Sequence, residues 1–202
     1  MSTSVIIFDC DGVMFDSQQA NVNFYNHILS HFGLPPLTNK DVAFVHMHTV
    51  VESLNRIFRG TPYGAKAQEY RLKVDYMPFI KDMVMEPGLK EVLDILKPRY
   101  GLAVATNRSN TIEKVLAING LSHYFEIVVS SLDVKNPKPH PEPIFKILNF
   151  FRIEPQECLY VGDSEVDFTV CQASGVPFIA YKNKSLKADY YIDNLLDILK
   201  IL

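Results

Sequence analysis

Five short apolar runs recur along this chain, and helical patterns separate most of them. The runs are SVIIF at 4–8, LAVAT at 102–106, EIVVSS at 126–131, CLYVG at 158–162 and PFIAY at 177–181. Each run is continuous rather than alternating, as expected of a strand that is covered on both faces. Strands that alternate with helices predict an α/β fold built on a doubly wound, mostly parallel, Rossmann-like sheet.

The helical segments between these runs have apolar residues on one side only. They cover residues 87–97, 111–120, 141–151 and 166–175. Two of them stop at a glycine, which readily adopts the left-handed conformation that ends many helices. These segments are expected to be the crossover helices of the parallel sheet.

The first crossover is far longer than one helix requires. Residues 17–82 contain no convincing strand and instead show helical spacing. One helix is expected over 22–32, and a second begins at Thr49, which forms a capping-box pattern with the glutamate three residues later. A third is expected over 65–77, broken by the proline that follows. We therefore expect a core of residues 1–16 and 83–202 with a helical insert, the cap, at 17–82.

Composition excludes several functional classes. The net charge of -3 offers no basic surface for nucleic acid or acidic membranes. Three cysteines are too few and too scattered for a disulfide framework or a zinc site. The early apolar stretch lacks a basic leader, and no run approaches the roughly 18 residues of a membrane span. A soluble, cytoplasmic protein is the expectation, while the oligomeric state is not readable.

Polar side chains follow four of the five apolar runs, where ligands bind in open α/β sheets. In chain order these residues are Asp9 and Asp11, then Thr106 and Asn107, then Lys138, then Asp163 and Asp167. Because the carboxyl ends of parallel strands meet at one edge of a sheet, we expect these side chains to converge.

Carboxylates gathered at one point repel each other, so a hard cation such as Mg²⁺ is the expected neutraliser. Asp9 and Asp163 are the candidate carboxylate ligands. The turn at Gly12 exposes the backbone carbonyl of Asp11 as a third protein ligand. The site is therefore predicted to hold Mg²⁺ through Asp9, Asp11 and Asp163.

Mg²⁺ commonly binds phosphate oxygens together with protein carboxylates. A phosphoryl group also needs hydrogen-bond donors for its remaining oxygens. Thr106 offers a hydroxyl, Asn107 begins a loop-to-helix turn with backbone N–H groups, and Lys138 brings a positive charge. The residue set therefore indicates a phosphorylated ligand.

Four short motifs carry a family resemblance. DCDGV at 9–13, ATNRS at 105–109, KPHPEP at 138–143 and GDSEVD at 162–167 resemble the four motifs of the haloacid dehalogenase superfamily, in the expected order. The insert resembles the helical cap of the phosphoglycolate-phosphatase-like branch. The resemblance implies a cap that closes over the site and selects the substrate.

The resemblance also implies a mechanism. Asp9 would attack phosphorus to form an aspartyl-phosphate. Asp11 would protonate the leaving oxygen and later take a proton from water. Thr106 and Lys138 would hold the phosphoryl oxygens, and Asp163 would bind Mg²⁺.

Asp167 would orient either the waters of the metal or the lysine. The implied protein is a Mg²⁺-dependent phosphatase that hydrolyses a small phosphomonoester metabolite.

Three other functions fit parts of the pattern. A β-phosphoglucomutase-like phosphomutase is favoured by DGV in place of the commoner DGT, but Asn21 and Val50 stand roughly where that family has its catalytic His and Arg. A dehalogenase needs neither magnesium nor a second acid, so Asp11 argues against it. A non-catalytic phosphoacceptor module resembling a response-regulator receiver would be shorter and lack the insert.

Four residues near these motifs have competing interpretations. Lys135 is a second lysine close to Lys138, although the Lys-Pro-x-Pro context favours Lys138. Cys10 is expected to point away from its acidic neighbours, as a small buried apolar residue. His46 and His48 suggest a metal pair, but no third ligand is evident, so a substrate-facing position or a plain helix end is the expectation.

Overall fold

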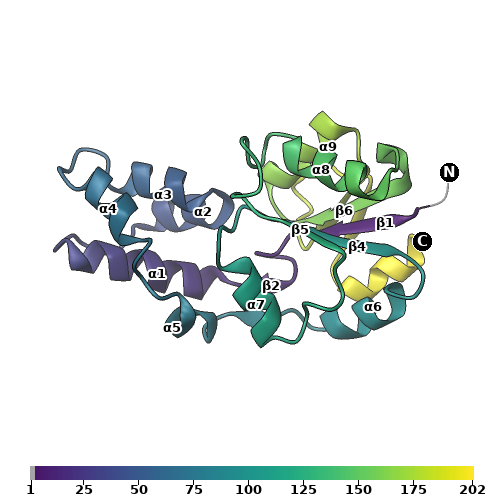
Figure 1. Cartoon of the computed structure of the whole chain (residues 1–202), viewed down its shortest axis with the longest axis horizontal. Helices are drawn as coiled ribbons and strands as arrows, with labels where there is room; N and C mark the ends of the chain where they lie inside the picture. Colours follow the sequence, from purple (N-terminus) through teal and green to yellow (C-terminus); the bar gives the residue numbers. More distant parts are fainter. Residues whose placement is uncertain (1–2) are drawn as a thin grey trace. The chain divides into compact units, whose positions relative to one another are not determined.

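A fully parallel six-stranded sheet is the framework of the computed structural model, which describes residues 3–202 (Figure 1). The strand order across the sheet is β5 (Ile127–Val129), β4 (Gly101–Ala105), β1 (Val5–Phe8), β6 (Cys158–Gly162), β7 (Phe178–Tyr181) and β8 (Tyr190–Ile192). Every neighbouring pair runs parallel. The order reverses at β1, so the predicted doubly wound α/β fold is confirmed.

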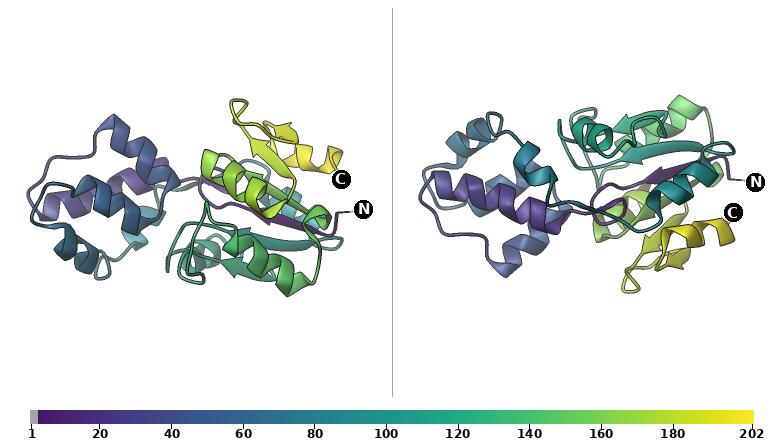
Figure 2. Two further views of the ribbon diagram at one scale, coloured as in Figure 1. Left: turned by 90° about the horizontal axis from the view of Figure 1, so that it is seen from above. Right: turned by 90° about the horizontal axis from the view of Figure 1, so that it is seen from below.

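Helices cover both faces of this sheet. The elements are α6 (Leu89–Leu96), α7 (Ile112–Ile118), α8 (Glu142–Phe151), η1 (Pro155–Glu157), α9 (Glu165–Ser174) and η2 (Leu195–Lys200). Figures 1 and 2 show α8 and α9 on one face and α6 with η2 on the other. Alternate residues of a strand point to opposite faces. Val5 and Ile7 accordingly pack with Ile144 and Ile147 of α8.

The insert forms a second compact unit made of helices. They are α1 (Gln18–His31), α2 (Asn39–Met47), α3 (Val50–Ile57), α4 (Gly64–Tyr70) and α5 (Met77–Ile80). An aromatic cluster joins α1 to α5, since Phe24 makes edge-on contacts with Tyr76 and Phe79. The capping box at Thr49 and Glu52 is present as predicted.

Contacts within the chain divide it into two compact units. One unit comprises Met1–Phe15 with Met85–Leu202, and the other comprises Asp16–Val84. The chain crosses between them through a two-stranded sheet of β2 (Phe15–Asp16) and β3 (Val84–Met85). The described residues contain no helix with the length and apolarity to cross a bilayer.

The prediction of one helix over 65–77 is wrong, because two separate helices cover this region. Helix α4 ends at Tyr70, and a new helix, α5, begins after Asp75, whose carboxylate accepts a hydrogen bond from the Met77 N–H at 3.1 Å. Pro78 lies in the first turn of α5, where its missing N–H costs no intrahelical bond. The proline therefore starts a helix there.

Candidate active site

The loop after β1 carries the first two acids. Asp9 extends the pairing with β6, because its N–H donates to the Val161 carbonyl at 2.9 Å. The chain then turns at Gly12, where φ is +80° and the N–H donates to the Phe15 carbonyl. The Asp9 side chain is 11% exposed. This turn leaves Asp9 and Asp11 at the carboxyl end of the central strand.

Lys138 reaches Asp9 from the loop before α8. Its ammonium donates to Asp9 Oδ1 at 3.0 Å, to Asp167 Oδ1 at 2.7 Å and to the Tyr160 hydroxyl at 2.8 Å. Burial opposes the charge, but the two carboxylates outweigh it and raise the pKa of Lys138. The competing Lys135 is exposed, and its backbone N–H donates to a glutamate of α8. The structure therefore brings Lys138 to Asp9.

Asp163 lies directly against the turn of the first loop. A Cβ atom built on Gly12 would come within 2.1 Å of Asp163 Oδ2, so only glycine leaves room for this carboxylate. Behind it, Asn183 donates from its side-chain amide to the Asp163 carbonyl at 2.8 Å. Asn183 follows β7, so a fifth strand end contributes to the site, and sequence reasoning had missed it.

Asp167 lies in the first turn of α9 and binds the lysine. Its Oδ2 accepts from the Ser164 hydroxyl at 2.6 Å in a capping box, and its Oδ1 accepts from Lys138 and Tyr160. Burial alone would raise the pKa of Asp167, but Lys138 and these hydrogen bonds bring it below its usual value. Of the two roles expected for Asp167, the structure shows the contact with the lysine.

Thr106 and Asn107 lie at the end of β4. Thr106 is buried, its N–H donates to the Val129 carbonyl of β5, and its Oγ1 accepts from the Arg108 N–H at 3.1 Å. Asn107 donates from its side chain to the Lys138 carbonyl at 3.0 Å, which ties two loops of the site together. The following helix, α7, begins at Ile112, so Asn107 lies in the loop that leads from β4 into this helix.

Arg108 is a functional candidate that sequence reasoning did not single out. Its guanidinium donates from Nη2 to Asp11 Oδ1 at 2.7 Å, and the two side chains are only 6% and 14% exposed. A charge-assisted bond between buried groups fixes both side chains. Only the placement of β4 beside β1 reveals the pair, because nothing in the loop sequence indicates the partner.

The acids of the site are not neutralised by protein cations alone. Burial raises the pKa of Asp9 to about 7, although Lys138 opposes the shift. Burial, with Asp167 and Asp9 adding repulsion, raises the pKa of Asp163 to about 8. Four aspartates face one lysine and one arginine, a net charge of −2 when all are ionised. A divalent cation would balance this charge.

The carboxylates are close enough together to bind such a cation. One oxygen from each of Asp9, Asp163 and Asp167 lies within 4.8 Å of the others. Asp167 is bound to Lys138, whereas burial and the neighbouring carboxylates raise the pKa of Asp163. Oxygen ligands of this kind suit Mg²⁺. Asp9 and Asp163 therefore fit the metal best, while a ligand role for the Asp11 carbonyl stays a prediction.

Comparison with known proteins assigns the family. A model of the haloacid dehalogenase-like hydrolases matches residues 6–181. The chain belongs to this family. A crystal structure of a HAD-superfamily hydrolase, subfamily IA, from Geobacter sulfurreducens is 40% identical and covers 100% of both chains with a TM-score of 0.89. The family assignment makes this protein a hydrolase.

Two further similarities are more distant. A curated relative in Bacillus mycoides, named pyrophosphatase PpaX, is 25% identical over 100% of this chain and 98% of its own length. A β-phosphoglucomutase from Clostridium difficile is 20% identical, covers 99% of this chain and 96% of its own, and has a TM-score of 0.85. At that identity the mutase shows the shared fold alone.

Cys10, His46 and His48 have no part in the chemistry proposed for the site. Cys10 is fully buried, and burial raises the pKa of its thiol well above the usual value, so the thiol stays protonated. His48 ends α2, and its Nδ1 lies 2.9 Å from the Phe44 carbonyl. In residues 3–202 the three-acid group is the one cluster with metal-ligand spacing, so His46 and His48 form none. His48 thus matches the plain helix end.

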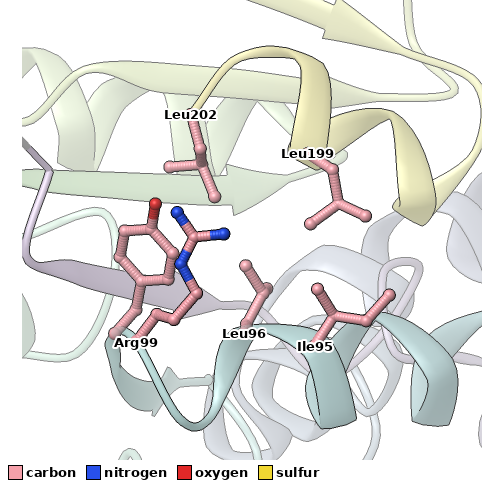
Figure 3. Close-up of a pocket in the computed structure, with 6 residues that line it drawn as sticks. Ile95, Leu96, Arg99, Leu199 and Leu202 are labelled. Atoms are coloured by element: carbon pink, nitrogen blue, oxygen red, sulfur yellow. The ribbon is translucent and has the colours of Figure 1, made fainter.

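A surface pocket of about 190 Å³ opens between α6 and η2 (Figure 3). It is lined by Ile95, Leu96, Arg99, Tyr100, Leu199 and Leu202. None of these six residues belongs to the candidate site of this hydrolase. The pocket therefore does not change the assignment.

Proposed function

We propose that this protein is a Mg²⁺-dependent phosphatase that hydrolyses a small phosphorylated metabolite through an aspartyl-phosphate. One observation carries the proposal above the others. The buried ammonium of Lys138 lies 3.0 Å from Asp9, whose carboxylate shares a cluster with Asp163. A cation fixed beside a buried carboxylate and a metal-binding pair is what a transferring phosphoryl group requires.

In the first half-reaction a carboxylate oxygen of Asp9 attacks phosphorus, and the bond from phosphorus to the leaving oxygen breaks. Asp11 delivers a proton to that oxygen. The ammonium of Lys138 and the hydroxyl of Thr106 donate to the phosphoryl oxygens, where negative charge is spread. The products of this step are the leaving alcohol or phosphate and a phosphorylated Asp9.

In the second half-reaction water attacks the phosphorus of phosphorylated Asp9. Asp11, now a carboxylate, takes the proton from this water, and Asp9 is released with inorganic phosphate. The Arg108 guanidinium, 2.7 Å from Asp11 Oδ1, stabilises the carboxylate that forms when Asp11 gives up its proton. Arg108 therefore favours proton donation in the first half-reaction and holds the Asp11 carboxylate in place for proton uptake in the second.

Mg²⁺ at Asp9 and Asp163 would neutralise the repulsion between the carboxylates and the phosphate dianion. The net charge of −2 at the site supports this requirement. Without the cation, burial keeps the pKa of Asp9 and Asp163 high and disfavours the ionised nucleophile.

The test is phosphate release by purified protein, with and without Mg²⁺. Substrates are p-nitrophenyl phosphate, phosphoglycolate, sugar phosphates, nucleotides and pyrophosphate, the last because a relative is named a pyrophosphatase. Asp9→Asn should abolish turnover. Asp193→Asn is the matched control, because Asp193 forms an exposed ion pair with Lys184 on the surface. This variant should retain full activity.

Two results would overturn the proposal. One is no phosphate release from any substrate in the presence of Mg²⁺, and the other is turnover by Asp9→Asn. Conversion of glucose 1-phosphate with a bisphosphate primer, without net phosphate release, would identify the mutase instead.

A further inference from the structure

Tyr160 lies beneath the candidate active site and is fully buried in β6. Its hydroxyl oxygen has three polar neighbours: Lys138 Nζ at 2.8 Å, Asp167 Oδ1 at 2.8 Å and the Ala105 carbonyl at 3.2 Å. The apolar run at 158–162 that contains Tyr160 predicts a buried strand, and the Tyr160 ring does pack in the core with residues of α8 and α9. The hydroxyl is thus the polar end of a core side chain.

The directions of these hydrogen bonds follow from which groups carry protons. An ammonium only donates, so the Tyr160 oxygen must accept from Lys138. Its own proton then goes to Asp167 or to the Ala105 carbonyl, both of which accept. Burial raises the pKa of Tyr160 well above its usual value, which keeps that proton in place. Tyr160 is therefore a fixed acceptor for one N–H of the lysine.

Lys138 has three N–H donors and three acceptors around it. Tyr160 and Asp167 hold two of them at 2.8 and 2.7 Å, and the longest contact, 3.0 Å, reaches Asp9. If Asp9 attacks phosphorus, the N–H that faces Asp9 also faces the transferred group. That donor can turn to a phosphoryl oxygen while the other two keep the ammonium in place.

We propose that Tyr160 is a positioning residue: its hydroxyl holds the Lys138 ammonium so that the third N–H faces Asp9 and the transferring phosphoryl group. This inference rests on the proposed phosphatase function. Loss of the hydroxyl leaves Lys138 with two fixed contacts and freedom to rotate about them. Small misplacement of a group that contacts the transition state slows catalysis sharply.

The variant that tests this role is Tyr160→Phe, which removes one oxygen and keeps the ring. The matched control is Tyr181→Phe on the neighbouring strand β7, because Tyr181 is equally buried and its hydroxyl donates to Glu86 at 2.7 Å, away from Lys138. Tyr160→Phe should lower kcat by about 10- to 100-fold with KM changed by less than about 3-fold. Tyr181→Phe should keep both near the wild-type values.

A second measurement does not depend on activity. In ¹⁵N-lysine-labelled protein, Lys138 should give a slowly exchanging ammonium signal, assigned by its loss in Lys138→Ala. That signal should exchange faster in Tyr160→Phe and remain protected in Tyr181→Phe. If the wild type releases no phosphate, the phosphatase proposal fails, while the exchange comparison still decides whether Tyr160 holds the lysine.

Three outcomes would overturn the role of Tyr160. They are a kcat for folded Tyr160→Phe within about 2-fold of wild type, an ammonium signal equally protected with and without the hydroxyl, and an unprotected signal in the wild type. The last needs no variant, so it decides the matter even if Tyr160→Phe does not fold.

Discussion

Replacing Gly12 with alanine tests how closely the first and fourth motif loops must approach. The new Cβ would lie 2.1 Å from Asp163 Oδ2 and 2.4 Å from Cγ, whereas ordinary contact begins at 3.4 Å. The three nearest atoms all belong to the Asp163 side chain, so this carboxylate would have to move by about 1.3 Å to restore ordinary contact. Such a shift takes Asp163 away from the proposed metal position.

Two effects of this substitution can be separated. Alanine at a positive φ costs about 1–2 kcal/mol of stability wherever it occurs. Gly60 has the same φ of +80° with nothing within 4 Å, so Gly60→Ala is a control that carries the backbone cost alone. Both variants should lose similar stability from the backbone, and only Gly12→Ala should lose metal affinity.

We expect Gly12→Ala to weaken Mg²⁺ binding by about 10- to 100-fold, the range found when support of a metal ligand is lost. This equals about 1.4–2.7 kcal/mol of binding free energy. The assay is a calorimetric Mg²⁺ titration of wild type, Gly12→Ala and Gly60→Ala, with thermal unfolding in parallel. Wild-type Mg²⁺ affinity in Gly12→Ala, or an equal loss in Gly60→Ala, would refute the argument from close contact.

Three further predictions concern the same site. In the folded protein the pKa values of Asp9 and Asp163 are raised to about 7 and 8, so their contribution to stability is full below about pH 4 and is lost as pH rises through 7–8. The rise in Tm on adding Mg²⁺ should therefore be larger at pH 8.5 than at pH 6. An equal rise at the two pH values would contradict these pKa shifts. Arg108→Met should lower kcat by about 10- to 100-fold because Asp11 loses its counterion, with Arg108→Lys less affected, and the idea fails in steady-state kinetics if both variants match wild type. Asn183→Ala removes one hydrogen bond to the Asp163 backbone and should weaken Mg²⁺ binding by about 3- to 10-fold in the same titration, where an unchanged Kd would argue against a supporting role.

Most of the site framework was predictable because acids, a hydroxyl and a lysine follow four separate apolar runs of the sequence. Parallel topology brings the carboxyl ends of the strands to one edge of the sheet, which is why the sequence alone groups Asp9, Lys138 and Asp163. The same rule applied to the fifth run would have indicated Asn183, since it follows β7 closely.

The position of Tyr160 inside a strand and the pairing of Arg108 with Asp11 could not be identified as functional in this way. Tyr160 reads as one more apolar residue of a buried strand, and its hydroxyl gains meaning only when Lys138 is placed across it. Arg108 lies in a polar loop where solvation is the ordinary expectation, and its partner is distant in sequence. Both roles depend on contacts between separate strand ends, which local patterns do not encode.

The prediction of secondary structure was wrong where turn-forming residues interrupt a helical spacing of apolar residues. Residues 65–77 have helix-forming composition throughout, yet the chain turns after Tyr70 and restarts at Asp75. No apolar run marks the late strand β8, because Tyr190 and Tyr191 are exposed to solvent over nearly half of their surface.

The central position of β1 in the sheet has a consequence for how the chain folds during synthesis. Val5 of β1 pairs with Gly101 of β4 on one side and Cys158 of β6 on the other, so the first strand made has no neighbour until the whole helical unit has been translated. At about 5–20 residues per second, β1 waits roughly 4–20 s for β4. A nascent chain that stops before β4 would therefore leave the apolar residues of β1 without strand partners, while the Asp16–Val84 segment is already complete.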